Sequence, residues 1–270
     1  MTWQKLSCHD AIGQIYNRCI QGKYNAKNKW VLDADIKGCF DNLEHESILE
    51  KIGTAPCVGL IEEWMKAGYV YQGIYNPIDT GTPQGGVISP LLSNIGLHGL
   101  EELVKSHNEK LGVVRYADDF VITAKKKSEI EDIKPRIGQW LAKRGLDFSE
   151  EKTTVKHIDE GFDFLGFNVR CYKNKLPIKP QKAKVLAFCK NIGEIIKSMK
   201  TAKQEVLIKK LNPVLRGWAN YYHKVVSKET FSYVSYRVWT YLWDWCKRRH
   251  NKRRLKWVKD KYFHVINGVD

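Results

Sequence analysis

Hydrophobic positions in the first 170 residues change period several times, between the spacing of a helix and that of a strand. Apolar side chains recur three and four positions apart in four stretches, which predicts amphipathic helices at about 7–22, 90–104 and 125–144 and, within 44–70, two helical pieces separated by Pro56 and Gly59. Short alternating or apolar runs predict strands at 30–36, 113–116 and 120–123, and a glycine-broken aromatic stretch predicts a hairpin within 68–80. The predicted fold is therefore α+β, with a small mixed or antiparallel sheet packed on helices.

The last hundred residues show helical periodicity. After a lysine- and proline-rich stretch at 173–180, which we interpret as a linker, helices are predicted from about residue 182 to the end. One apolar stripe consists of Leu207, Leu211, Leu215 and Trp218. A longer stripe, within 230–249, consists of Tyr233, Tyr236, Trp239, Tyr241, Leu242, Trp243 and Trp245. We expect most of these aromatic side chains to fill the core of a helix bundle. The pattern indicates two regions, 1–170 and 171–270.

Composition narrows the class of protein. Hydrophobic residues make up 43% of the 270 positions, which is enough for a sizeable core, and no run of about 18 apolar residues indicates a membrane span. The first ten residues lack the apolar stretch of a signal peptide. Seven cysteines are scattered without a Cys-x-x-Cys pair, which argues for a reducing compartment and against a zinc site. We therefore expect a cytoplasmic protein, in the bacterial cytosol or an organelle interior, with no membrane partner.

Charge is unevenly distributed between the two regions. Residues 1–170 hold 21 Lys and Arg against 24 Asp and Glu, whereas residues 171–270 hold 24 against 6. The second region therefore carries a net charge of +18, and the whole chain carries +15. A basic excess of this size in about a hundred residues is typical of a nucleic-acid binder.

Two acidic segments lie on predicted strands. Asp118 and Asp119 form the tip of the hairpin between 113–116 and 120–123, and alternation in 30–36 puts Asp35 and Asp33 on one face. Buried or adjacent carboxylates need a cation beside them. If the strands pair, Asp35, Asp118 and Asp119 converge on a site for Mg²⁺ or Mn²⁺, since these hard ions prefer oxygen ligands. Two ions about 3.5–4 Å apart would serve phosphoryl transfer. A solvated Asp-Asp turn is the alternative.

Three motifs, in this order, carry a family resemblance. They are Asp-Ile-Lys-Gly-Cys-Phe-Asp at 35–41, Gly-Thr-Pro-Gln-Gly-Gly-Val-Ile-Ser-Pro-Leu-Leu at 81–92 and Tyr-Ala-Asp-Asp at 116–119. Together they resemble a group II intron-encoded reverse transcriptase, also called an intron maturase, from about Ser7 to about Phe263. The resemblance implies a reverse-transcriptase palm with a remnant of the fingers over 1–170, followed by an α-helical thumb, or maturase domain X, over 171–270.

The resemblance also implies an activity and its residues. An RNA-directed DNA polymerase would extend a DNA primer on an RNA template with deoxynucleotides, using two Mg²⁺ ions held by Asp35, Asp118, Asp119 and the carbonyl of Ile36. Three further residues would contact the incoming nucleotide. Phe40 would exclude a 2′-hydroxyl, Gln84 would touch the sugar or base, and Lys152 would protonate the leaving pyrophosphate. The primer end would be gripped by Phe164, Leu165 and Gly166.

Each of these assignments has a plainer alternative. Phe40 could be a core side chain, Lys152 a surface lysine, and 164–166 an apolar strand with a bulge at Gly166. For His45, which has no neighbouring Cys or second His, we favour a structural role over a metal ligand.

Basic residues of the second region are expected to bind intron RNA. They are Arg216, Lys247, Arg248, Arg249, Lys252, Arg253 and Arg254. A solvated basic tail is the alternative for the cluster that starts at Lys247. By resemblance the sequence begins inside the fingers, so the chain could also be an inactive RNA-binding maturase fragment, or one completed by a separate fingers polypeptide.

Overall fold

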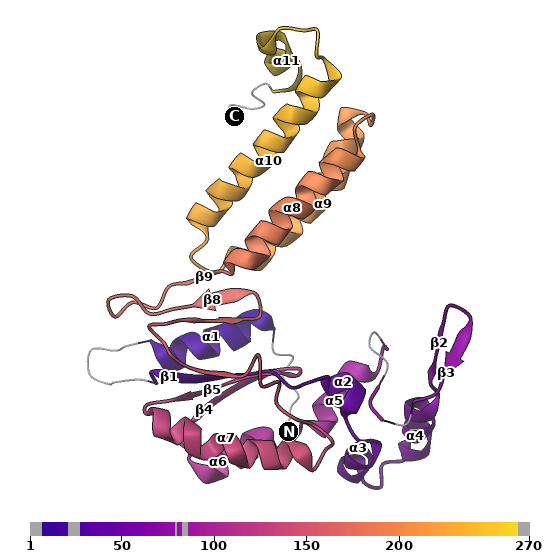
Figure 1. Ribbon diagram of the computed structural model, residues 1–270, viewed down its shortest axis with the longest axis vertical. Helices are drawn as coiled ribbons and strands as arrows, with labels where there is room; N and C mark the ends of the chain where they lie inside the picture. Colours follow the sequence, from indigo (N-terminus) through magenta and orange to yellow (C-terminus); the bar gives the residue numbers. More distant parts are fainter. Residues whose placement is uncertain (1–6, 21–27, 79, 83–85, 264–270) are drawn as a thin grey trace. The chain divides into compact units, whose positions relative to one another are not determined.

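The computed structural model describes residues 7–20, 28–78, 80–82 and 86–263 (Figure 1). These residues divide into two compact units. The first, the palm unit, consists of Met1–Leu165 with Val169–Leu176, and the second, the helical unit, consists of Gly166–Asn168 with Pro177–Asp270. None of the described helices combines the length and the apolarity that crossing a membrane requires.

A four-stranded antiparallel sheet organises the palm unit. Its strands lie in the order β4 (Gly112–Tyr116), β5 (Asp119–Ala124), β1 (Trp30–Ala34) and β6 (Thr154–His157). The register pairs Trp30 with Ala124 and Ala34 with Phe120, so β1 and β5 form the centre of the sheet. Strands from distant parts of the sequence are therefore neighbours, and the last residue of β1 lies beside the start of β5.

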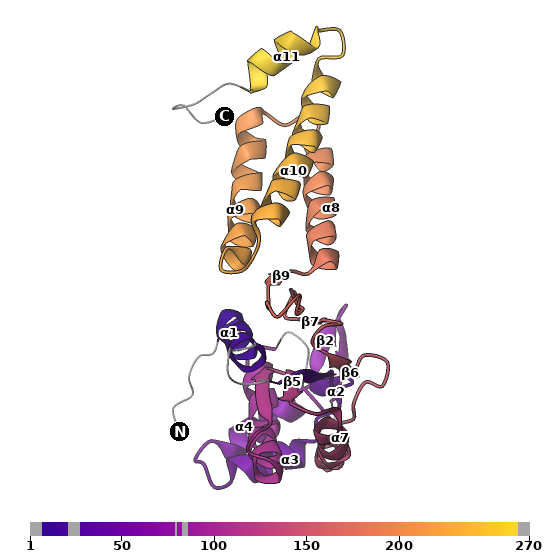
Figure 2. The ribbon, with the colours of Figure 1, turned by 90° about the vertical axis from the view of Figure 1, so that its left-hand side faces the viewer.

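Helices cover both faces of this sheet, as the edge-on view shows (Figure 2). On one face, Leu32, Ala34, Phe120 and Ile122 pack with α6 (Leu100–His107) and α7 (Lys127–Ala142) in the main hydrophobic core. On the other face lies α1 (Cys8–Cys19), whose first turn is closed by reciprocal hydrogen bonds between its cap and Asp10. The strand alternation in 30–36 thus reflects two differently covered faces.

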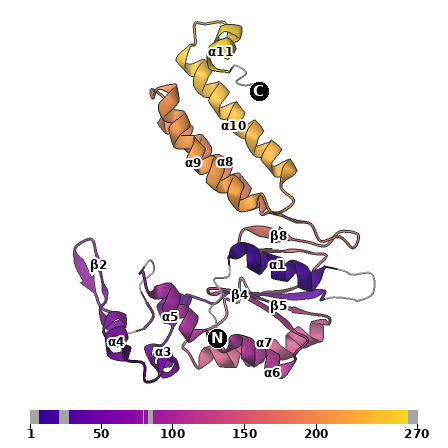
Figure 3. The ribbon, with the colours of Figure 1, turned by 180° about the vertical axis from the view of Figure 1, so that it is seen from behind.

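Between β1 and β4 the chain makes an excursion of short elements. It contains α2 (Cys39–Asn42), α3 (His45–Ile52), α4 (Val58–Lys66), the hairpin β2 (Tyr69–Tyr71) and β3 (Ile74–Asn76), and α5 (Ser89–Gly96) (Figure 3). The single helix predicted over 90–104 is wrong, because α5 ends at Gly96 and α6 begins at Leu100. Gly99 takes a φ of 102°, which an α-helix cannot accommodate. At the start of α5, Ile88 is the cap and Ser89 is the first helical residue.

Three short strands lie where the chain passes from one unit to the other. They are β7 (Phe162–Phe164), β8 (Phe167–Val169) and β9 (Ile178–Pro180), and they form one small sheet in that order. The linker expected over 173–180 is therefore partly a strand. Of its two prolines, Pro180 is the last residue of β9, which is an edge strand, where a missing backbone donor is tolerated.

The helical unit is built from three long helices and a short one. They are α8 (Lys182–Ser198), α9 (Gln204–Tyr222), α10 (Lys228–Arg249) and α11 (Leu255–Tyr262). The core between them includes Ile192, Ile196, Leu207, Leu211 and Trp245. Three aromatic residues expected in this core are instead exposed, at 42%, 63% and 48% of their surface: Tyr233, Tyr236 and Trp239. The buried positions of α10 are instead Val234, Trp245 and Cys246. The expected α+β fold, with a helical region after the antiparallel sheet, is confirmed.

Candidate active site

The two acidic segments meet at one end of the two central strands, β1 and β5. Because Ala34 pairs with Phe120, the next residue, Asp35, emerges beside Asp119 at the start of β5. Across the β4–β5 hairpin Tyr116 pairs with Asp119, which puts Asp118 in the connecting turn. The structure thus brings Asp35, Asp118 and Asp119 to neighbouring positions, as the sequence predicts.

The turn that carries Asp118 is held by a residue that sequence reasoning did not single out. Ala117 has a φ of 55°, in the left-handed region that non-glycine residues seldom adopt. The largely buried Arg115 donates from Nη1 to the carbonyl of Ala117 at 3.0 Å and to Oδ1 of Asn94 at 2.9 Å. Its signal in the sequence was a cation inside the apolar run of β4. Arg115 therefore helps to fix the conformation of the carboxylate-bearing turn.

The carboxylates interact electrostatically. Burial raises the pKa of Asp119, the negative charges of Asp118 and Asp35 raise it further, and Lys152 lowers it. The ammonium of Lys152 lies 3.2 Å from Oδ2 of Asp35 and donates a hydrogen bond to it. The site therefore combines the like charges of neighbouring carboxylates with the positive charge of Lys152.

Asp33 belongs to the same acidic region. Burial raises the pKa of Asp33 to about 6; Lys156 lowers it, while Asp119, Asp163 and Asp35 raise it. A strongly perturbed carboxyl beside other carboxylates is frequent at functional sites. Alternation in the sequence indicated its face but not its degree of burial.

The donor set suits a hard divalent cation. Carboxylate oxygens carrying several negative charges are the ligands that Mg²⁺ and Mn²⁺ prefer. Among the described residues, no group of three or more His, Cys, Asp or Glu side chains is already arranged around a metal position. The backbone of Ile36 faces Phe148 in an isolated bridge whose hydrogen bonds are made by Asp35 and Lys37, so these two bonds do not use the Ile36 carbonyl.

A loop is fastened next to the Asp35–Asp41 segment. The amide of Gly81 donates to the carbonyl of Leu43 at 2.9 Å, and that of Thr82 donates to the carbonyl of Phe40. Nε2 of the buried His45 lies 2.6 Å from the carbonyl oxygen of Gly81, so His45 has a structural partner. Phe40 is half-buried in α2. Gln84 lies outside the described residues.

Phe164, Leu165 and Gly166 form the end of β7 and the turn into β8. Phe164 is buried, whereas Leu165 and Gly166 both take positive φ, at 49° and 77°. This is a tight hairpin turn rather than a bulge within one strand. The carbonyl of Gly166 accepts hydrogen bonds from the amide of Gln181 at 2.9 Å and the hydroxyl of Tyr222 at 3.1 Å.

The basic residues of the helical unit differ in what they contact. Arg249 donates from Nη1 to the carbonyls of Lys200 and Ala202, at 2.9 and 2.8 Å, and lies over the ring of Trp245. Lys247 pairs with Asp244 at 3.0 Å. The remaining predicted RNA-binding residues are exposed: Arg216, Arg248, Lys252, Arg253 and Arg254. Arg249 therefore has a structural role in joining α10 to the α8–α9 connection.

His250 follows these arginines. Its Nε2 lies 2.8 Å from the hydroxyl of Tyr262. The pKa of His250 is lowered, first by desolvation and then by the positive charges of Lys261, Arg249 and Arg253. Protonation of this side chain is therefore disfavoured in the folded protein.

Comparison with known proteins agrees with this geometry. Residues 4–169 match the family described as reverse transcriptase (RNA-dependent DNA polymerase), and residues 185–263 match the group II intron, maturase-specific domain. The chain is 27% identical over 272 residues to the group II intron-encoded protein LtrA of Lactococcus lactis subsp. cremoris, covering 76% of this chain and 44% of LtrA. It is 28% identical over 177 residues to protein YkfC of Escherichia coli K12, covering 52% of this chain and 46% of YkfC.

The fold has a solved counterpart. An apo telomerase structure from Candida tropicalis superposes with a TM-score of 0.54 at 13% identity, covering 89% of this chain and 50% of that one. The chain thus spans less than half the length of the curated relatives above. Since the polymerase-type match alone covers more than half of the sequence and a maturase-specific domain follows it, this protein belongs to the reverse transcriptase family, as a group II intron reverse transcriptase/maturase.

Proposed function

We propose that this protein catalyses RNA-directed DNA synthesis at the Asp35, Asp118 and Asp119 cluster, and that its helical unit binds group II intron RNA and assists splicing. The observation that carries the first part is the convergence of three carboxylates from two separate segments, where the end of β1 lies beside the start of β5. Family membership supports the same reaction.

Each residue of the cluster has a part in the proposed chemistry. Asp35, Asp118, Asp119 and the carbonyl of Ile36 would hold two Mg²⁺ ions, which when bound activate the primer 3′-hydroxyl and stabilise charge on the departing pyrophosphate. Lys152, already against Asp35, is placed to donate a proton to the leaving group. Arg115 keeps the Asp118 turn in shape.

Three other groups would position the substrates. Phe40 would lie under the sugar of the incoming deoxynucleotide and exclude a 2′-hydroxyl. The loop that starts at Gly81 would place Gln84 at the same nucleotide, and the bonds to Leu43 and His45 support that loop. The 164–166 turn would hold the primer end. The template, primer and deoxynucleotides are the proposed partners of the palm unit.

Primer extension tests the polymerase part. We expect wild-type protein to extend a DNA primer on an RNA template with deoxynucleotides and Mg²⁺, and Asp119→Asn to lower the rate at least about a hundredfold, the size of loss seen when one transition-state contact is removed. Asp132→Asn is the matched control, since Asp132 is an exposed carboxylate on α7. Equal rates for the two variants would refute the role of the cluster.

The second candidate function is intron RNA binding without polymerisation. It is favoured by the concentration of positive charge in residues 171–270, with 24 basic against 6 acidic residues. Here wild-type protein would bind intron RNA with a steep salt dependence and Asp119→Asn would bind equally well. If wild-type protein extends no primer at high nucleotide concentration, alone or with a separate fingers polypeptide, this candidate replaces the first.

A further inference from the structure

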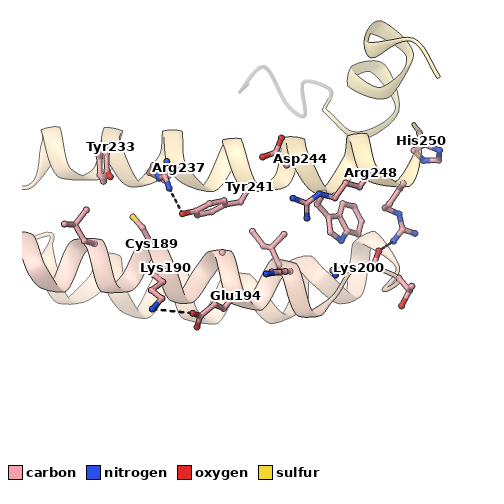
Figure 4. A pocket seen from close by; sticks show the side chains of 17 residues that line it. Cys189, Lys190, Glu194, Lys200, Tyr233, Arg237, Tyr241, Asp244, Arg248 and His250 are labelled. Carbon is pink, nitrogen blue, oxygen red and sulfur yellow. Dashed lines mark hydrogen bonds and ion pairs between the residues drawn. The ribbon is translucent and has the colours of Figure 1, made fainter. Parts of the chain in front are cut away.

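A groove runs along the helical unit between α8 and α10 (Figure 4). It encloses about 980 Å³ and is lined by one face of each helix, from Leu186 to Lys197 on α8 and from Tyr233 to Arg249 on α10, with Lys200 and Thr201 of the segment that follows α8. At a rise of about 1.5 Å per residue, the lining face extends for roughly 17 Å on α8 and roughly 24 Å on α10. These lengths correspond to about five to seven phosphates of a stacked nucleic-acid strand, at about 3.4 Å each.

The charge on the groove is strongly positive. Six basic side chains line it: Lys190, Lys197, Lys200, Arg237, Arg248 and Arg249. Its two acidic side chains are each close to a lysine, Glu194 at 4.0 Å from Lys190 and Asp244 at 3.0 Å from Lys247. The positive charge therefore remains largely uncompensated, and the groove is complementary to an anionic ligand.

Several of these cations have no partner of their own. Within the part of the chain that the structure describes, the side chains of Lys197, Lys200 and Arg248 make no hydrogen bond or ion pair. They are exposed and lie on the groove. Unlike Arg249, which is engaged by backbone carbonyls, these three cations are available to phosphates.

Arg237 adds a buried, unsatisfied donor to the groove wall. Its Nη2 donates to the hydroxyl of Tyr241 at 2.6 Å, and the guanidinium lies 4.9 Å from the centre of that ring. Its Nε is buried and has no hydrogen-bond partner among the described residues. A buried donor without a partner is uncommon in a native protein. A bound phosphate oxygen would be a partner of suitable charge.

Aromatic side chains of α10 contribute to the lining of the groove. Gly193 lies in the middle of α8, where glycine disfavours a helix by about 1 kcal/mol relative to alanine. A Cβ at that position would come within 3.2–3.4 Å of the Tyr241 ring, so glycine allows the ring to lie close to α8. Tyr233, 42% exposed, offers a further aromatic surface on the same wall. Basic grooves with accessible aromatic rings are typical sites for single-stranded nucleic acid.

We propose that the α8–α10 groove binds a single-stranded RNA segment, with Lys197, Lys200, Arg237 and Arg248 contacting phosphates and Tyr233 stacking on a base. This inference rests on the proposed RNA binding of the helical unit and assigns it a location. Single-strand binding proteins combine a basic groove that follows the backbone with aromatic rings on which bases stack, and this groove has both features.

Binding of one oligonucleotide by three proteins tests the proposal. The probe is a fluorescent 12-nucleotide oligouridylate, and the groove variant of the full chain is Lys197→Gln, Lys200→Gln and Arg248→Gln. The control variant, Lys209→Gln, Lys210→Gln and Lys224→Gln, removes the same charge from exposed lysines that do not line the groove. Loss of three phosphate contacts should weaken binding about 50-fold at 0.15 M salt and reduce the slope of log affinity against log salt by about 2. The control should lose less than about threefold.

The outcomes separate this proposal from the function on which it rests. Equal binding by the groove and control variants, with tight binding by wild-type protein, would overturn the groove while leaving RNA binding intact. A loss seen only with a 12-base-pair RNA duplex would overturn it in favour of a duplex site. No binding by wild-type protein would overturn both.

A footprint of wild-type protein gives a readout that does not depend on the folding of a variant. Lysine acetylation followed by mass spectrometry should show protection of Lys197 and Lys200 by the oligouridylate, and none of Lys209 and Lys210. Equal protection of both pairs would contradict the proposal.

Discussion

Gly81→Ala should destabilise the palm unit and displace the loop that leads into the proposed nucleotide site. Gly81 has a φ of 76°, and a Cβ built on it would lie 2.4 Å from the carbonyl oxygen of Phe40 and from backbone atoms of Asp41. Those atoms belong to α2, directly after the segment that carries Asp35. Because the obstruction is backbone, no side-chain rotation can relieve it.

The expected magnitude has two parts. A left-handed backbone costs a non-glycine residue about 1–2 kcal/mol, and forcing an extra carbon into a packed site costs about 1–3 kcal/mol. Gly81→Ala should therefore lower the free energy of unfolding by about 2–5 kcal/mol. If the loop moves to relieve the overlap, the hydrogen bonds of Gly81 to Leu43 and His45 are strained, at about 1 kcal/mol each.

Gly73→Ala is the matched control. Gly73 has a φ of 81°, in the turn between β2 and β3, and nothing lies within 4 Å of a Cβ placed there. This variant carries the backbone penalty without the overlap, so it should cost only about 1–2 kcal/mol. The difference between the two variants isolates the close approach of Gly81 to α2.

Equilibrium urea unfolding, followed by tryptophan fluorescence, measures both variants. In the same preparations, steady-state primer extension should show a raised KM for deoxynucleotide in Gly81→Ala and an unchanged one in Gly73→Ala. If Gly81→Ala loses no more stability than Gly73→Ala, the contact between the loop and α2 does not constrain the fold and the reasoning fails.

Three further predictions concern single side chains. Arg249→Ala should lower the stability of the helical unit by about 1–2 kcal/mol, since charged hydrogen bonds to two carbonyls are lost, whereas Arg248→Ala should change it by less than about 0.5 kcal/mol; equal effects in thermal melting would contradict this. Because the folded protein lowers the pKa of His250, the unfolded chain binds the proton more readily, so stability should decline as pH falls below about 6.5. Melting temperatures from pH 8 to pH 5 should show this decline, and His250→Gln should reduce it. Cys57 is exposed, whereas burial raises the pKa of Cys39 to about 11; Ellman's reagent at pH 8 should label Cys57 quickly and Cys39 only on unfolding, and early labelling of Cys39 would refute its burial.

Sequence pattern predicted the elements that carry the acidic cluster because their signals are local. The alternation in 30–36 and the apolar runs around Asp118 follow the two-residue period of a strand, so the strands and the hairpin could be placed. The register that puts Asp35 beside Asp119 is not local, since it depends on pairing across more than eighty residues. Order of motifs and family resemblance, rather than period, led to the prediction that they meet.

Other features escaped prediction for identifiable reasons. The helix break at Gly99 depends on one backbone angle. An isolated glycine is tolerated inside a helical pattern, so the sequence does not reveal that angle. The exposure of Tyr236 and Trp239 was missed because large apolar and aromatic side chains occur on all sides of α10. Its hydrophobic stripe is therefore wide and does not define one buried face. Arg248 and Arg249 are adjacent residues of the same type, so the sequence does not distinguish them. Only the folded position of the α8–α9 connection shows that Arg249 is the one that bonds to it.

The cluster of acidic residues at the end of β1 and the start of β5 does not favour stability. The negative charge of Asp35 raises the pKa values of Asp33 and Asp119, and the charge of Asp118 raises the pKa of Asp119. Lys152, through an exposed ammonium, partly offsets this repulsion at Asp35 and at Asp119. A sheet with no ligand to bind would be more stable with neutral residues at these positions, since buried polar groups without full compensation are costly. This electrostatic cost agrees with the proposed role of Asp35, Asp118 and Asp119 as ligands of a cation.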